Sequence, residues 1–103
     1  MTVAASMRIL SEVLGERASQ NVKWGTQDHP DGTGSDTHVA QSRRMRDECD
    51  RAFRQGRGMW RHILAEEVAE AIACDNPADL REELIQVAAV AVAWIEAIDR
   101  RTA

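Results

Sequence analysis

The chain has 103 residues, and its 17 Asp and Glu against 13 Lys and Arg give a formal net charge of −4. This length suffices for one modest hydrophobic core, so we predict a single domain over residues 1–103. The acidic balance argues against general nucleic-acid binding, which needs a basic surface. The longest uninterrupted apolar run, residues 87–95, is too short to span a bilayer. Cys49 and Cys74 have no zinc-binding spacing, and reduced thiols are typical of a cytoplasmic protein.

The first half of the chain predicts two helices separated by a loop. Residues 3–22 have the apolar spacing of an amphipathic helix, carried by Met7, Ile9, Leu10, Val13, Leu14 and Ala18. Residues 23–36 are polar and include three glycines and Pro30, so they predict a loop. Residues 37–58 predict a highly charged helix, closed by glycines at 56 and 58, with few apolar positions. We interpret it as a peripheral helix; the alternative is an interface or lid helix whose arginines bind an anionic ligand.

The second half predicts a helical hairpin. One helix is expected over residues 59–74 and another over residues 77–101. Between them, Asn76 before Pro77 indicates a helix start, because Asn caps a helix and Pro fits its first turn. So short a connection makes the two helices antiparallel neighbours.

The predicted fold class is therefore all-α. No stretch shows sustained strand alternation, and we expect a bundle of about four helices built around the antiparallel hairpin. The last helix is expected to bury a stripe made of Leu80, Leu84, Val87, Ala91, Trp94 or Ile95, and Ile98. Four helices of this size make a thin core, so we expect a homo-oligomer to bury the remaining apolar faces.

Acidic residues occur at matching heights on the two hairpin helices. Glu70 lies six residues before Asn76 and Glu83 seven after it, whereas Glu67 lies nine before and Gln86 ten after. Because a helix rises about 1.5 Å per residue, each pair is expected at nearly the same height. The paired residues are three apart in each helix, so they share a face. Three carboxylates and an amide are thus expected to converge.

Carboxylates held that close repel one another, and burying them is costly unless a cation joins them. Several oxygen ligands without Cys or His favour Mg²⁺, or alternatively Mn²⁺, over Zn²⁺. The alternative interpretation is a solvated helix face, as in most Glu-rich helices.

The ordered acidic motifs resemble those of the MazG-like all-α nucleotide pyrophosphohydrolases, of the small bacterial and phage type. The first half-motif is Glu66-Glu67-Val68-Ala69-Glu70, and the second is Glu83-Leu84-Ile85-Gln86, where Gln86 replaces the Asp of the pattern. The upstream residues 20–32, QNVKWGTQDHPDG, also look like this family. Together these stretches extend over most of the chain.

The resemblance implies a dimeric or tetrameric enzyme that uses Mg²⁺ to cleave a nucleoside triphosphate into a monophosphate and pyrophosphate. Carried over by position, Glu67, Glu70 and Glu83 would be metal ligands, with Gln86 in the fourth place. Glu66 and Glu67 would be the catalytic residues, and Glu66 would either bind metal or orient the attacking water.

Basic and aromatic side chains are the expected substrate-binding groups. Arg or Lys would neutralise the leaving pyrophosphate, and the candidates are Lys23, Arg61, Arg100 and Arg101. Trp24 and Trp60 could stack a base, although a tryptophan is more often a core or interface anchor. His62 is, by the same reasoning, more often a structural residue than a catalytic one.

Two further functions stay open, and the first of them follows from Gln86, which removes one negative charge from the expected site. One is a nucleotide-binding or regulatory protein of the same fold with weak catalysis. The other is a structural module that uses its Ala-rich last helix to bind a partner.

Overall fold

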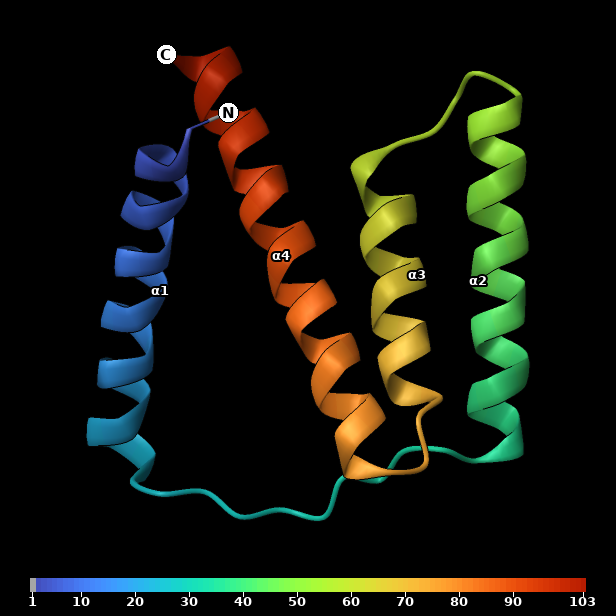
Figure 1. Ribbon diagram of the computed structural model, residues 1–103, viewed down its shortest axis with the longest axis horizontal. Helices are drawn as coiled ribbons and strands as arrows, with labels where there is room; N and C mark the ends of the chain where they lie inside the picture. The colour runs from blue at the N-terminus through green and yellow to red at the C-terminus, as the bar shows by residue number, and fades with distance from the viewer. Residues whose placement is uncertain (1) are drawn as a thin grey trace. The chain divides into compact units, whose positions relative to one another are not determined.

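The computed structural model describes residues 2–103, and this part of the chain forms four α-helices without any strand (Figure 1). The helices are α1 (Val3–Trp24), α2 (Asp36–Arg54), α3 (Trp60–Ile72) and α4 (Pro77–Thr102). The predicted all-α fold class is confirmed. The bounds of α1, α3 and α4 lie within two residues of the predicted ones. The largest shift is at the end of α2, which stops at Arg54 and not at the predicted residue 58.

Polar side chains cap the N-termini of three of the helices. The Thr2 side chain accepts a hydrogen bond from the Ala5 amide at the start of α1, and Ser35 accepts one from the His38 amide at the start of α2. At the start of α4, Asn76 Oδ1 accepts a hydrogen bond from the Asp79 amide at 2.9 Å. These bonds satisfy amide groups that have no partner within a helix. The predicted Asn76 cap is therefore present.

The contacts divide the chain into two compact units, which are described separately. One unit contains α1 and the end of α4, from Val92 onward. The other extends from Gly32 to Ala91 and contains α2, α3 and the first part of α4. The hairpin predicted from the sequence lies in this second unit.

In the second unit, α2 packs closely against α3. Small side chains occupy this contact. The buried residues of α2 are Ser42, Cys49 and Ala52, and those of α3 are His62, Ala69 and Ala71. Although the sequence suggested a peripheral helix, α2 thus supplies part of the core. His62 is a structural residue here, because its Nδ1 atom accepts a hydrogen bond from the Met59 amide at 3.0 Å.

The loop before α2 is fastened to the α3–α4 turn by two hydrogen bonds. The Gly34 amide donates to the Ile72 carbonyl at 2.9 Å, and the Thr33 hydroxyl donates to the Cys74 carbonyl at 2.7 Å. The Ile72 carbonyl is at the end of α3, where helical partners are missing, and that of Cys74 is in the turn that follows. The loop therefore helps to fix the turn that sets the register of the hairpin.

In the first unit, α1 contacts the end of α4 through a buried polar pair. Ile9 is the buried apolar residue of α1, and the Ser6 hydroxyl donates a hydrogen bond of 2.6 Å to Glu96 Oε1. Glu96 is only 3% exposed and is the buried residue of α4.

Several large apolar side chains remain at the surface. Three members of the stripe predicted to be buried on α4 are exposed, namely Leu84, Ile95 and Ile98. On α1, Val3, Met7, Leu10 and Leu14 are also exposed, and their alternating spacing of four and three residues places them along one side of the helix. No helix in residues 2–103 combines the length and apolar character needed to cross a membrane.

Candidate functional site

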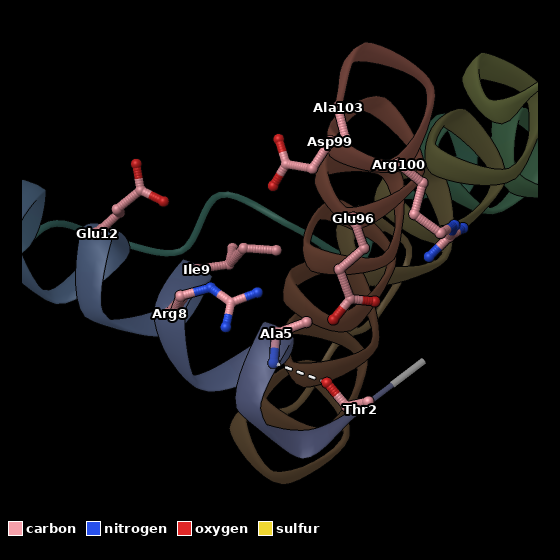
Figure 2. A pocket seen from close by; sticks show the side chains of 9 residues that line it. All are labelled: Thr2, Ala5, Arg8, Ile9, Glu12, Glu96, Asp99, Arg100 and Ala103. Carbon is pink, nitrogen blue, oxygen red and sulfur yellow. Dashed lines mark hydrogen bonds between the residues drawn. The ribbon is translucent and has the colours of Figure 1, made fainter.

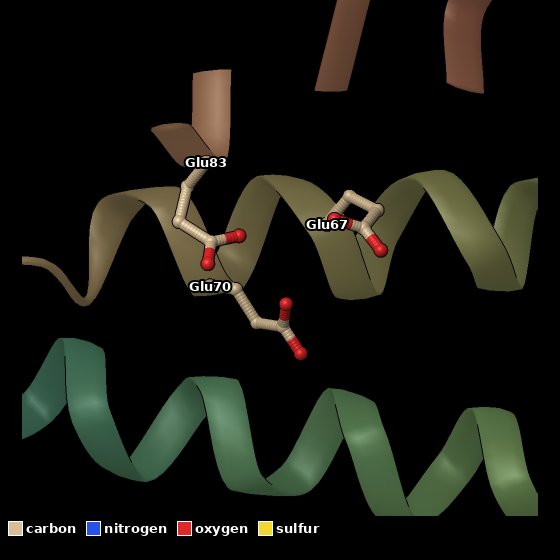
Figure 3. A group of neighbouring side chains, drawn as sticks. All are labelled: Glu67, Glu70 and Glu83. Carbon is tan, nitrogen blue, oxygen red and sulfur yellow. The ribbon is translucent and has the colours of Figure 1, made fainter. Parts of the chain in front are cut away.

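Three carboxylates converge on the hairpin of the second unit (Figure 3). Glu67 and Glu70 lie one turn apart on α3, and Glu83 reaches them from α4. One carboxylate oxygen of each residue lies within 4.8 Å of an oxygen of the other two. All three side chains are half-buried. The convergence predicted by counting from Asn76 is present for these three residues.

Burial and mutual repulsion both disfavour the charged form of this cluster. Burial raises the pKa of the Glu67 carboxyl, and the charges of Glu70, Glu83 and Glu66 raise it further. Burial likewise raises the pKa of Glu83, with Glu70 as the next largest cause. A divalent cation bound between the carboxylates would remove this repulsion.

One basic side chain reaches the cluster from α2. Arg46 Nη2 lies 3.4 Å from Glu70 Oε1, which is the only ion pair found in residues 2–103. The Arg46 side chain is 57% exposed, and such solvated pairs contribute at most about 1 kcal/mol. One long, exposed ion pair does not balance three carboxylates.

The donor set fits a small divalent cation. The cluster offers carboxylate oxygens without Cys or His, which are the ligands that Mg²⁺ and Mn²⁺ prefer. Two ligands on opposite sides of an octahedral Mg²⁺ are about 4.2 Å apart. Neighbouring ligands of such an ion are only about 3 Å apart. The three oxygens lie within 4.8 Å of one another, so side-chain movements would bring them into one coordination shell. Water and substrate oxygens would fill the remaining positions.

Two other residues of the predicted site have different surroundings. Glu66 is half-buried beside α2, where it interacts with Cys49. Burial, followed by a hydrogen bond with Glu66 and the Glu66 charge, raises the pKa of the Cys49 thiol to about 11. Gln86 is exposed on α4, one turn beyond Glu83. Asp79 accepts a hydrogen bond from Asn76 Nδ2 at 2.8 Å and so belongs to the helix cap.

The predicted substrate-binding residues are distributed over both units. Trp60 is half-buried at the start of α3, and Arg61 is exposed beside it. Lys23 and Trp24 end α1 in the other unit, where the Lys23 ammonium lies 4.9 Å from the centre of the Trp24 ring. Trp24 is 62% exposed. Trp60 and Arg61 are thus the two that share a unit with the acidic cluster.

An open pocket of about 380 Å³ lies beside Glu70 and Glu83. Its other polar side chains include Ser42 and Arg46 from α2 and Asp79 from α4. Arg46 is its only basic residue. The sequence indicated only that some arginine of this helix could meet an anion, because the register of α2 on α3 determines which one does.

The raised pKa values predict how pH affects the metal-free protein. Between the ordinary Glu pKa of about 4.3 and the raised folded values, the folded state binds more protons than the unfolded chain. The free energy of unfolding is therefore expected to fall as pH rises through this window. Added Mg²⁺ should reduce the fall, because the cation stabilises the ionised carboxylates. Urea unfolding from about pH 4 to 7, with and without Mg²⁺, measures both effects.

The matched control is the Glu67→Gln/Glu83→Gln double variant, which lacks both titrating groups. Its stability should change less steeply over the same pH range and should not respond to Mg²⁺. Identical pH profiles for the variant and the wild type would contradict the role assigned to the cluster.

We compared the chain with known proteins. No protein-family model matches it, and no curated protein or solved structure shows significant similarity.

Proposed function

We propose that this protein is a cytoplasmic, Mg²⁺-dependent nucleoside triphosphate pyrophosphohydrolase of the MazG-like type. The observation that supports this proposal most is the convergence of Glu67, Glu70 and Glu83 from two helices. A structural module has no need to bring like charges together in a half-buried position, because their repulsion destabilises it. A triphosphate hydrolase does need such a site, because its substrate binds with divalent cations.

The three carboxylates would hold the cation on the hairpin and leave part of its coordination shell open toward the pocket. When bound, Mg²⁺ would neutralise phosphate oxygens and lower the pKa of a coordinated water. Burial and the neighbouring carboxylates raise the pKa of Glu67 in the metal-free cluster, and the cation would stabilise its ionised form as a ligand beside the coordinated water. Glu66 interacts with Cys49 of α2, so it would help to position α3 against α2 rather than hold the cation.

A nucleotide-binding protein without rapid hydrolysis is the second candidate. The observation that favours it is Gln86, which is neutral and exposed where the resembled pattern has a carboxylate. Both candidates share the metal site and the nucleotide, and they differ only in turnover.

The exposed apolar side chains of α1 and α4 support the proposed homo-oligomer. A second copy that covered such faces would remove apolar surface from water, at about 25 cal/mol per Å². Light scattering after gel filtration would determine the assembly state, and a monomer at micromolar concentration would contradict this part of the proposal.

The test of the proposed function is product analysis with a panel of ribo- and deoxyribonucleoside triphosphates, with Mg²⁺ or Mn²⁺. We expect monophosphate and pyrophosphate in equal amounts, with no activity in EDTA. Nucleotide binding without products would favour the second candidate. Neither binding nor products with any nucleotide would contradict both and leave the structural module.

Restoring the carboxylate at position 86 should strengthen metal binding. An exposed carboxylate near a divalent cation contributes about 1 kcal/mol, so Gln86→Asp should lower the Mg²⁺ concentration at half-maximal activity about 3- to 10-fold. In Gln86→Asn the new side chain has the shape of Asp but no charge. This variant should need the same Mg²⁺ concentration as the wild type. A higher Mg²⁺ requirement in Gln86→Asp would show that position 86 does not face the cation.

A further inference from the structure

A second pocket lies in the other unit, between α1 and the end of α4 (Figure 2). Its volume is about 530 Å³, which is within the range of small-molecule sites. Ala5 and Ile9 supply apolar surface from α1, and Glu96 and Asp99 supply carboxylates from α4. The pocket is distinct from the acidic cluster of the hairpin and shares no residue with it.

Glu96 is a buried acid with an unused hydrogen-bonding atom. Its Oε1 atom accepts the short bond from the Ser6 hydroxyl, whereas its buried Oε2 atom has no hydrogen-bond partner among residues 2–103. The carboxylate of a residue that is only 3% exposed normally has partners for both oxygens, since a buried polar atom without one is destabilising. The Ser6 bond fixes the carboxylate at the wall of the pocket, and the second oxygen requires a donor.

The charges around the pocket favour a cation as that donor. Glu12 and Asp99 add two carboxylates to that of Glu96. Figure 2 shows the Arg8 guanidinium on the α1 side of the pocket, whereas Arg100 projects away from α1. Neither arginine forms an ion pair, because the only ion pair in residues 2–103 is that of Arg46 with Glu70. The three acids outnumber the two arginines that line the pocket, so its lining has a net negative formal charge.

The acids of this pocket are not gathered as those of the hairpin are. In residues 2–103, the only group of three possible ligands with atoms within 4.8 Å of one another is that of the hairpin. Glu12, Glu96 and Asp99 do not form such a group. A larger cation can span the pocket, with its charge at the carboxylate and its apolar body on the helices.

We propose that this pocket binds a small organic cation, whose ammonium or guanidinium group donates hydrogen bonds to Glu96 while its aliphatic body packs on Ala5 and Ile9. A charged donor matches the carboxylate better than a neutral one, because charge-assisted hydrogen bonds are about twice as strong. This site does not depend on the proposed hydrolase activity.

Butylammonium and butylguanidinium are suitable probes, and butanol and butyrate are matched controls with the same body but no positive charge. Calorimetric titration of the full chain should show saturable binding of the two cations only. Amide NMR signals of Ser6, Ile9 and Asp99 should shift with the same affinity. Absence of cation binding, or equal binding of butanol, would overturn the proposal. Preferential binding of butyrate would also overturn it, because the pocket would then bind an anion through Arg8.

Variants locate the binding group. Glu96→Gln preserves the size of the side chain and an acceptor for Ser6, and it should weaken cation binding about 10- to 100-fold. Glu12→Gln removes an exposed charge from the same pocket and should weaken binding only a few-fold. Arg8→Gln removes a competing positive charge and should strengthen binding. Unchanged affinity in Glu96→Gln would overturn the proposal.

If Glu96→Gln does not fold, Ala5→Leu provides the decisive variant. It fills the pocket from α1 and leaves every charge in place, so it should abolish cation binding while circular dichroism shows the same helix content. Binding of the cations by folded Ala5→Leu with wild-type affinity would place them elsewhere and refute the site.

Discussion

Replacing Glu70 with Gln is expected to lower metal-dependent pyrophosphate release about 10²- to 10³-fold. Glu70 interacts electrostatically with both other acids, because its charge raises the pKa of Glu67 and of Glu83. Glutamine has the same size and keeps one oxygen, so the change removes charge from the metal site with little effect on packing. Metal ions supply several kcal/mol of transition-state stabilisation, and each 1.36 kcal/mol changes the rate tenfold.

The same variant should fold as well as the wild type. Removing Glu70 relieves repulsion in the cluster, and the ion pair with Arg46 that is lost contributes at most about 1 kcal/mol. Glu82→Gln is the matched control, because Glu82 is an exposed acid next to Glu83 and outside the cluster. Loss of activity in both variants, or unfolding of Glu70→Gln in circular dichroism, would contradict the assignment of Glu70 as a ligand.

Gly34→Ala is expected to have the largest effect on stability, at about 2–4 kcal/mol of unfolding free energy. Gly34 has a φ of +86°, which is strained for any residue with a Cβ atom. A Cβ atom there would lie 2.6 Å from the Asp75 Cα atom and 3.0 Å from the Cys74 carbonyl oxygen. The loop would have to move away and lose the hydrogen bond to Ile72.

Gly32→Ala separates the two causes of this loss. Gly32 has a φ of +68° but nothing near the position of a Cβ atom, so only the backbone strain of about 1–2 kcal/mol should appear. Because the loop fastens the turn that aligns Glu70 with Glu83, Gly34→Ala should also weaken Mg²⁺ binding. Urea unfolding of the two variants measures the difference, and equal stabilities would show that the α3–α4 turn does not need this contact.

The acidic cluster could be predicted because it depends on local rules. The Asn76 cap fixes where α4 begins, and constant helical rise then places Glu83 opposite Glu70 without any knowledge of tertiary packing. The direction of Glu66 could not be obtained in this way. It depends on how α2 lies on α3, because its interaction partner is Cys49.

The packing of α2 was harder to predict because its buried residues are small or polar. Ser42, Cys49 and Ala52 share a face, but none gives the strong apolar signal by which core helices are recognised. For the apolar stripe on α4, the sequence signal for burial was strong, and the structure only partly matches it. Its large apolar residues predicted burial, and yet Leu84 is 51% exposed.

The most direct test of the metal site is a titration with Mn²⁺, a spectroscopic substitute for Mg²⁺, followed by electron paramagnetic resonance. We expect the wild-type protein to bind Mn²⁺ saturably, to release it on addition of Mg²⁺, and to retain this binding in Glu82→Gln. Glu70→Gln and Glu83→Gln should each lose it. Failure of the wild type to bind Mn²⁺, or equal binding by all four proteins, would contradict a metal centre formed by Glu67, Glu70 and Glu83.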